Sequence, residues 1–162
     1  MSDSKKSRIL VIDDDEGIRK VVAEALKSDD YLVDTASNGK EAVEKSQTNF
    51  YNLALIDIRL PDMEGTELLT SMKRTTPEMI KIILTGYPAL PNAIDAVNKG
   101  AHGYLVKPIK MDELLRTVEQ HLKKQSEMKQ YSEEKVAQFV ETRLQEIQTQ
   151  EGLDSQKTTK KQ

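Results

Sequence analysis

Short apolar runs alternate along the chain with segments in which apolar residues recur every three or four positions. An uninterrupted run is typical of a strand buried on both faces of a sheet, and the wider spacing is typical of an amphipathic helix. Five strands alternating with five helices predict an α/β fold with a parallel sheet and right-handed crossovers. The expected strands are 8–12, 31–36, 53–57, 80–84 and 103–106, and the expected helices lie near 18–26, around 42–43, at 66–74, near 91–98 and from 111 onward.

The helical spacing also predicts which side chains face the core. Pro77 should end the third helical segment, and Gly100 is placed to cap the fourth helix. The expected core side chains are Ile18, Val21, Val22, Ala25 and Leu26 in the first helix, Leu68, Leu69 and Met72 in the third, Ala93, Ile94 and Val97 in the fourth, and Leu114, Leu115, Val118 and Leu122 in the last.

The character of the chain changes after Leu122, where charged residues become frequent and apolar ones rare. We therefore expect four parts. They are a polar N-terminal tail over 1–7, one domain over 8–122, a charged and helical extension over 123–150, and a disordered tail over 151–162.

The extension carries a second, narrower apolar stripe at helical spacing. No Pro or Gly occurs between Lys110 and Glu151, so the last helix is free to continue. Alternatively, Tyr131 and Ser132 supply the staple and N-cap of a separate helix. The stripe is either part of a solvated, frayed helix or a contact surface for a partner or a second copy. Its members are Val136, Phe139, Val140, Arg143, Leu144 and Ile147.

The composition of the 162 residues narrows the class of protein. Apolar residues make up 37% and charged residues 31%, and no apolar run approaches the ~20 residues of a membrane span. The polar N-terminus does not resemble a signal peptide, and the absence of cysteine fits a reducing compartment, so we expect a cytoplasmic protein. The net charge of −3 favours no binding to nucleic acid.

Four of the five expected strands are followed at once by a charged or hydroxyl side chain. Asp13 and Asp14 follow the first strand, Asp57 ends the third, Thr85 follows the fourth and Lys107 follows the fifth. Each residue alone has an ordinary explanation as a helix cap, a turn hydroxyl or a surface charge. Because the carboxyl ends of parallel strands share one edge of a sheet, however, we expect these side chains to converge.

Such a cluster supports a specific chemistry. Three crowded carboxylates repel one another unless a cation holds them, and oxygen ligands without cysteine or clustered histidine favour Mg²⁺ or Mn²⁺. An ammonium and a hydroxyl group complete what an aspartyl-phosphate site needs. One carboxylate attacks a phosphoryl group, and the cations neutralise charge on the phosphoryl oxygens.

Between Arg8 and Leu122, the chain resembles a response-regulator receiver domain of two-component signalling, of the single-domain, chemotaxis-regulator type. The resemblance implies a doubly wound (βα)5 flavodoxin-like parallel sheet of strand order 2-1-3-4-5. The motifs that carry it are the acidic pair Asp13 and Asp14, the stretch Asp57–Gly65, the segment Leu84–Gly86 and the segment Tyr104–Pro108.

The resemblance also implies a role for each residue of the cluster. Asp57 would be the phospho-acceptor. Mg²⁺ would be bound directly by Asp14, by Asp57 and by the backbone carbonyl of Arg59, and Asp13 would act mainly through water. Lys107 would pair with the carboxylate or the phosphoryl group.

Thr85 and Tyr104 would form the switch pair. Thr85 would donate to the phosphoryl group, and Tyr104 would turn into the vacated space. That movement would repack the face formed by the fourth helix, the fifth strand and the fifth helix, and so shift a pre-existing equilibrium.

Two local features complete the resemblance. Asp15 lies just past the usual acidic pair and is expected to favour the start of the first helix. The Lys107–Pro108 bond is a candidate cis peptide.

The implied function is that of a phosphorylation-activated regulator. A sensor histidine kinase or a phosphotransfer protein would supply the phosphoryl group, and a downstream effector protein would read the switched face. The domain would catalyse only its own phosphorylation and dephosphorylation, so we do not expect an enzyme that turns over a separate substrate. The alternative is a receiver-like docking module that works without phosphorylation.

Readings from other classes are less consistent with the residues. A small phosphohydrolase of the haloacid-dehalogenase-like group would need a second Asp two residues after the nucleophile, where this chain has Arg59. A flavodoxin-like cofactor site would need glycines and free N–H groups where this chain has carboxylates.

The segment after Leu122 is short for a folded output domain and carries too little basic charge for a DNA-binding one. We therefore expect a single-domain regulator. A homodimer could form through the switched face or through the extension.

Overall fold

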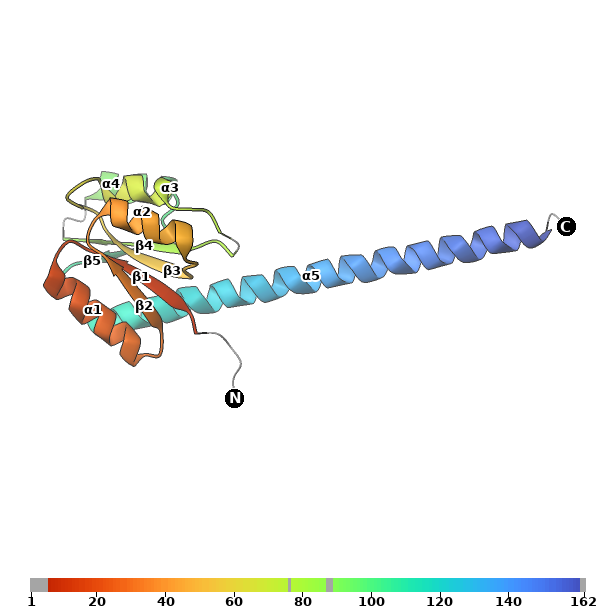
Figure 1. Cartoon of the computed structure of the whole chain (residues 1–162), viewed down its shortest axis with the longest axis horizontal. Helices are drawn as coiled ribbons and strands as arrows, with labels where there is room; N and C mark the ends of the chain where they lie inside the picture. Colours follow the sequence, from red (N-terminus) through yellow and green to blue (C-terminus); the bar gives the residue numbers. More distant parts are fainter. Residues whose placement is uncertain (1–5, 76, 87–88, 161–162) are drawn as a thin grey trace. The chain divides into compact units, whose positions relative to one another are not determined.

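The computed structural model describes residues 6–75, 77–86 and 89–160, in which strands and helices alternate from the N-terminus (Figure 1). The elements are β1 (Arg8–Ile12), α1 (Glu16–Ser28), β2 (Leu32–Ala36), α2 (Gly39–Thr48), β3 (Leu53–Asp57), α3 (Gly65–Ser71), β4 (Ile80–Thr85), α4 (Leu90–Asn98), β5 (Gly103–Val106) and α5 (Met111–Lys160). Part of the expected N-terminal tail, residues 1–5, lies outside the described residues.

The strands form one parallel sheet in the order β2-β1-β3-β4-β5, which confirms the predicted fold class. The register aligns the carboxyl ends of neighbouring strands. Ile12 of β1 pairs with Ile56 of β3, and Asp57 pairs with Leu84 of β4. Thr85 pairs with Val106 of β5. The residues that follow these strands therefore emerge at one edge of the sheet.

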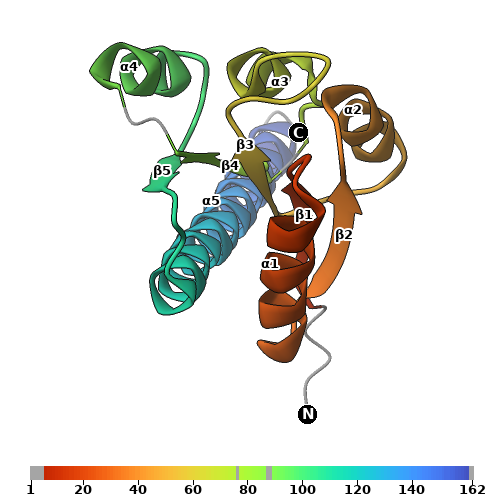
Figure 2. The same cartoon turned by 90° about the vertical axis from the view of Figure 1, so that its left-hand side faces the viewer.

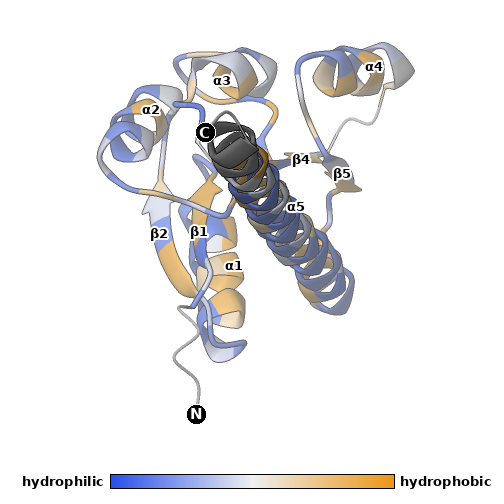
Figure 3. Ribbon diagram, turned by 90° about the vertical axis from the view of Figure 1, so that its right-hand side faces the viewer, coloured by the Kyte–Doolittle hydropathy of each residue, from blue (hydrophilic) through white to orange (hydrophobic). Residues whose placement is uncertain are grey.

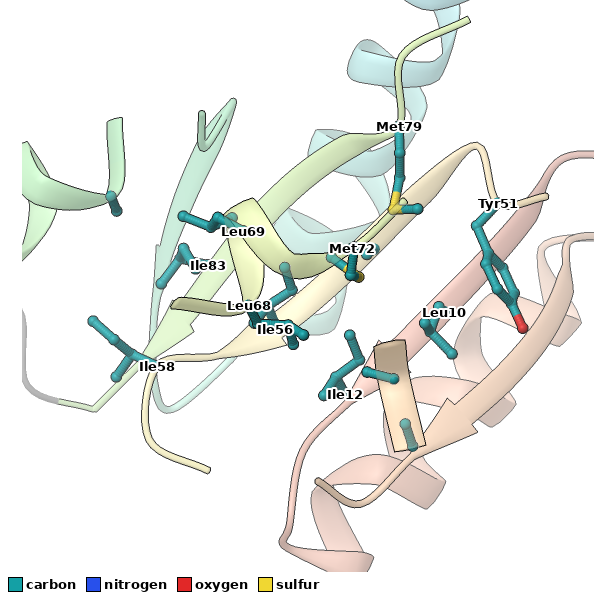
Figure 4. Packing of buried hydrophobic residues seen from close by; sticks show 14 residues of the cluster. Leu10, Ile12, Tyr51, Ile56, Ile58, Leu68, Leu69, Met72, Met79 and Ile83 are labelled. Carbon is teal, nitrogen blue, oxygen red and sulfur yellow. The ribbon is translucent and has the colours of Figure 1, made fainter. Parts of the chain in front are cut away.

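Two apolar layers cover the sheet, as expected for strands that are buried on both faces. Figure 2 shows α2, α3 and α4 on one side of the sheet, and α1 with the first turns of α5 on the other. Leu10, Ile12, Ile56 and Ile83 turn toward the first group of helices, as Figure 4 shows. The alternate strand residues turn toward the second group, where they pack against Val22, Leu26, Leu114, Val118 and Leu122.

The structure corrects the predicted burial of α4. Among the side chains of α4 whose burial is described, Ala96 is fully buried, whereas Ile94 and Val97 are 52% and 64% exposed. Val21 of α1 is likewise exposed, although its spacing placed it on the apolar stripe. Helical spacing identifies an apolar stripe, but only the packing of the helix decides which part of that stripe meets the sheet.

Two helix ends test the sequence signals for termination. Gly100 has a φ of 104°, the left-handed conformation that ends a helix, so its predicted capping role is confirmed. The third helix was predicted to reach Arg74 but ends at Ser71. Met72 takes an extended backbone conformation and is 3% exposed, so burial of this side chain in the core overrides helix continuation.

The chain divides into two compact units, Met1–Gln125 and Ser126–Gln162. In the second unit α5 is continuous, so the separate helix considered from Ser132 does not form. Residues 151–160, which were expected to be disordered, are helical, and residues 161–162 lie outside the described part. Gly152 weakens a helix by about 1 kcal/mol, which does not suffice to end it.

All side chains described between residues 126 and 153 are exposed. Figure 3 shows α5 as mainly hydrophilic with apolar positions interspersed. Within the described part of the chain, no helix combines the length and the apolar character needed to cross a bilayer.

Candidate functional site

The turn after β1 places the carboxylates of Asp13, Asp14 and Asp15 in three different environments. The backbone N–H of Asp13 donates to the Ala36 carbonyl at 3.1 Å, which extends the strand pairing by one residue and leaves the Asp13 side chain fully buried. Asp15 is the N-cap of α1, and its carboxylate accepts a hydrogen bond from the Ile18 N–H at 3.1 Å. This confirms the role predicted for Asp15. Asp14, between them, is exposed.

The turn after β3 fixes the backbone beneath the predicted acceptor. The N–H of Gly65 donates to the Ile58 carbonyl at 2.7 Å. A Cβ atom on Gly65 would lie only 2.3 Å from the Asp57 carbonyl oxygen, so no other residue fits without a shift of the backbone. Asp57 is 7% exposed, and its carboxylate accepts a long hydrogen bond of 3.4 Å from the backbone N–H of Arg59.

Lys107 joins the carboxylates of two strands. Its Nζ lies 2.9 Å from Asp13 Oδ2 and 3.5 Å from Asp57 Oδ1. The backbone N–H of Lys107 donates to the Thr85 carbonyl at 2.7 Å, which carries the β4–β5 pairing to the edge where the lysine emerges. The Lys107–Pro108 peptide bond is cis, as predicted.

The carboxylates form a compact cluster. Asp13, Asp14 and Asp57 each offer an oxygen atom, and these atoms all lie within 4.8 Å of one another. The predicted convergence of strand ends is therefore present. The donor set consists of carboxylate oxygens with no cysteine or histidine, which fits a hard divalent cation. The predicted contribution of the Arg59 carbonyl stays a prediction.

The electrostatics follow from this crowding. Burial and the nearby charge of Asp13 raise the pKa of Asp57 from 3.8 to about 6, and Lys107 opposes part of that shift. Burial lowers the pKa of Lys107, but its hydrogen bond to Asp13 and the charges of both carboxylates outweigh it and raise that pKa above its usual value. The site therefore carries excess negative charge that a bound cation would relieve.

The predicted switch residues are Thr85, at the end of β4, and Tyr104, on the neighbouring strand β5. Thr85 is fully buried at the end of β4. Tyr104 pairs with Ile83 across the sheet and packs against the apolar layer beneath α2, α3 and α4. Its hydroxyl group is buried and has no hydrogen-bond partner among the described residues. Val106 of β5, like Ile94 and Val97 of α4, exposes its side chain to solvent.

Sequence reasoning missed an apolar cleft of about 290 Å³ next to Lys107. Helix α1 contributes Ile18 and Val21 to it, and the segment before α5 contributes Pro108 and Ile109. The sequence feature that pointed to this cleft was Val21. Its side chain lies on the apolar stripe of α1, but it borders the cleft and is exposed instead of packing in the core.

Comparison with known proteins identifies the family to which the chain belongs. The sequence profile of the response regulator receiver domain matches residues 9–119. The chain belongs to the response regulator receiver family. Receiver domains act in two-component signalling, and in this chain Asp13, Asp57 and Lys107 meet at the edge of the sheet where the parallel order of the strands predicted them.

Relatives of known sequence are longer than this chain. The transcriptional regulatory protein ZraR of Klebsiella oxytoca is 36% identical over 114 residues, which are 70% of this chain and 26% of ZraR. The alginate biosynthesis transcriptional regulatory protein AlgB of Pseudomonas aeruginosa is 36% identical over 110 residues, 68% of this chain and 24% of AlgB. The chain thus spans about a quarter of the length of these two relatives.

Solved structures of receiver domains are similar over most of the chain. A CheY-like receiver domain protein from Methanospirillum hungatei is 40% identical with a TM-score of 0.73, covering 76% of this chain and 99% of that one. A response regulator from Burkholderia pseudomallei, solved with a phosphorylated aspartic acid, a calcium ion and citrate, is 29% identical with a TM-score of 0.62. That match covers 68% of this chain and 65% of the other.

Proposed function

We propose that this protein is a phosphorylation-activated response regulator whose phospho-acceptor is Asp57. The observation that carries the proposal is the joint placement of Asp13, Asp57 and Lys107, which come from three different strand ends, with the ammonium of Lys107 in contact with both carboxylates. A buried carboxylate with an adjacent ammonium and two further carboxylates is suited to accept and hold a phosphoryl group.

The donor would be a phosphohistidine of a sensor histidine kinase or of a phosphotransfer protein. An Asp57 carboxylate oxygen attacks phosphorus, the phosphorus–nitrogen bond breaks, and the imidazole leaves with the bonding electron pair and takes up a proton. The Lys107 ammonium lies close enough to move from Asp13 toward the new phosphoryl oxygens, and its positive charge stabilises them.

The carboxylate cluster would hold Mg²⁺ or Mn²⁺ through Asp14, Asp57 and the Arg59 carbonyl, with Asp13 acting through water. Such an ion, when bound, neutralises negative charge on the phosphoryl oxygens. The chain itself contributes rigidity, because the close packing of Gly65 against the backbone of Asp57 and Ile58 fixes the backbone that carries the attacking carboxylate.

Phosphorylation would then be read on the face formed by α4, β5 and α5. A phosphoryl group adds about −1.5 to −2 charges at the edge of the sheet. Thr85 would donate a hydrogen bond to it, and Tyr104 would reorient. The exposed apolar side chains of Ile94, Val97 and Val106 support this face as the contact surface for an effector protein.

The proposal is tested by intact mass after incubation with acetyl phosphate and Mg²⁺. We expect one added phosphoryl group in the wild type, none in Asp57→Asn, and none in the wild type after chelation. Asp62→Asn is a matched control, because that carboxylate lies in the same β3–α3 turn but accepts hydrogen bonds from the backbone N–H groups of Gly39 and Lys40 instead. This control should be phosphorylated normally.

Small phosphodonors do not serve every receiver, so beryllofluoride provides a second test. A complex that requires Mg²⁺ and Asp57 would support the acceptor role without a donor. Absence of both the adduct and the complex would overturn the proposal and leave the phosphorylation-independent docking module, which would use the same exposed apolar face.

A further inference from the structure

The second compact unit exposes an apolar stripe that nothing in the described chain covers. Val140, Leu144 and Ile147 are 50%, 55% and 50% exposed. A helix in water gains most of its stability by packing an apolar face, and a helix without such packing frays. Helix α5 is continuous to Lys160, so a surface that covers this stripe would stabilise it.

We propose that a second copy of this chain packs against Val140, Leu144 and Ile147 of the stripe, in a parallel, in-register coiled coil centred on residues 137–147. Ala137, Val140, Leu144 and Ile147 follow one another at intervals of three, four and three residues. This is the spacing of the a and d positions of the heptad abcdefg, whose side chains interlock between helices. The four positions carry no charged residue.

The flanking charges select a second copy in parallel orientation. Just before the four apolar layers, Lys129 occupies a g position and Glu134 the e position five residues later, so a parallel pair places these opposite charges together across the interface, next to Glu133 at the d position of that turn. An antiparallel pair that keeps the four apolar layers in contact would place Glu141 against Glu141 of the second copy and Arg143 against Arg143. Both contacts would be repulsive.

Two polar side-chain contacts within this part of α5 do not involve the a and d positions. Arg143 forms an ion pair with Glu146 at 3.0 Å, and the Lys135 ammonium lies 5.4 Å from the centre of the Tyr131 ring. These residues occupy positions other than a and d, so the contacts they make are compatible with a neighbouring helix along the a and d positions.

This association goes beyond the phosphoryl-transfer function and does not depend on it. The stripe belongs to Ser126–Gln162, a unit separate from the receiver domain. A substitution in the stripe should therefore leave phosphorylation of Asp57 unchanged, and Asp57→Asn should leave the association unchanged.

Sedimentation equilibrium of the full chain tests the association. We expect a mass of at least twice the 18.3 kDa of one chain for the wild type, and a single-chain mass for Leu144→Glu. Gln145→Glu is the matched control, because its side chain is exposed on the far side of the helix and should not change the mass. A monomeric wild type at 100 μM, or an oligomer that persists in Leu144→Glu, would overturn the proposal.

Disulfide cross-linking tests the orientation, since the natural chain has no cysteine. Ala137→Cys and Ile147→Cys, oxidised separately with copper phenanthroline, should each form a disulfide with the same residue of a second copy. Gln145→Cys should not. If the two variants cross-link only when they are mixed, the helices are antiparallel and the proposal is wrong.

Discussion

Replacing the carboxylate of Asp57, the proposed acceptor, should stabilise the metal-free protein. In the wild type, Asp57 is nearly buried and shares one ammonium with Asp13, so its ionised form is unfavourable in the folded state. Asp57→Asn removes that charge but keeps the shape of the side chain. We therefore expect higher stability for this variant in the presence of a chelator.

The magnitude and its pH dependence follow from the pKa of Asp57. Folding raises this pKa from 3.8 to about 6, and a difference of about 2 units corresponds to about 3 kcal/mol. Screening by solvent at the open side of the site lowers the expected gain to about 1 to 3 kcal/mol. Because the folded pKa is raised, the wild type bears the full penalty above pH 6, and the penalty disappears as the pH falls toward 3.8.

The assay is urea unfolding followed by circular dichroism in a chelator, at pH 8 and at pH 5. Asp57→Asn should exceed the wild type in free energy of unfolding at pH 8, and the difference should shrink at pH 5. Asp62→Asn should show no such gain, because backbone hydrogen bonds lower the pKa of Asp62. A variant no more stable than the wild type at pH 8, or a difference independent of pH, would refute the reasoning.

Three further substitutions test local packing by the same unfolding measurement. Gly65→Ala places a Cβ atom 2.3 Å from the Asp57 carbonyl oxygen and should lower the free energy of unfolding by about 2 kcal/mol or more. Tyr104→Phe removes a buried hydroxyl without a partner among the described residues, so stability should stay equal or rise by up to about 1 kcal/mol; a larger loss would contradict this. Asp34→Ala should lower stability by about 1 to 3 kcal/mol, because it leaves the buried Tyr51 hydroxyl without the carboxylate 2.6 Å away.

The sequence was most informative where one physical requirement dominates. Strands buried on both faces must be largely apolar, so the apolar runs of β1, β3 and β4 predicted the centre of the sheet, and the parallel order then predicted that Asp13, Asp57 and Lys107 would meet. The detailed contact was less predictable. Lys107 lies nearer to Asp13 than to Asp57, a difference that depends on side-chain positions across three strands.

Helix packing was less predictable for the same reason. The spacing in α4 marks Ile94 and Val97 as apolar positions, but the contact of Ala96 with the core sets the rotation of the helix and leaves those two side chains in solvent. The continuity of α5 was left open, because Ser132 can act as an N-cap or as an ordinary helix residue. Local sequence does not decide between these.

The charge balance of the site has a thermodynamic consequence for the cell. Three carboxylates and one ammonium leave about two negative charges, which one divalent ion cancels. If the ion favours the phosphorylated form by a given factor, linkage requires that phosphorylation raise the affinity for the ion by the same factor. The equilibrium fraction of phosphorylated protein would then depend on free Mg²⁺ as well as on the phosphoryl donor, and the wild type and Asp57→Asn should differ in how strongly Mg²⁺ shifts their unfolding.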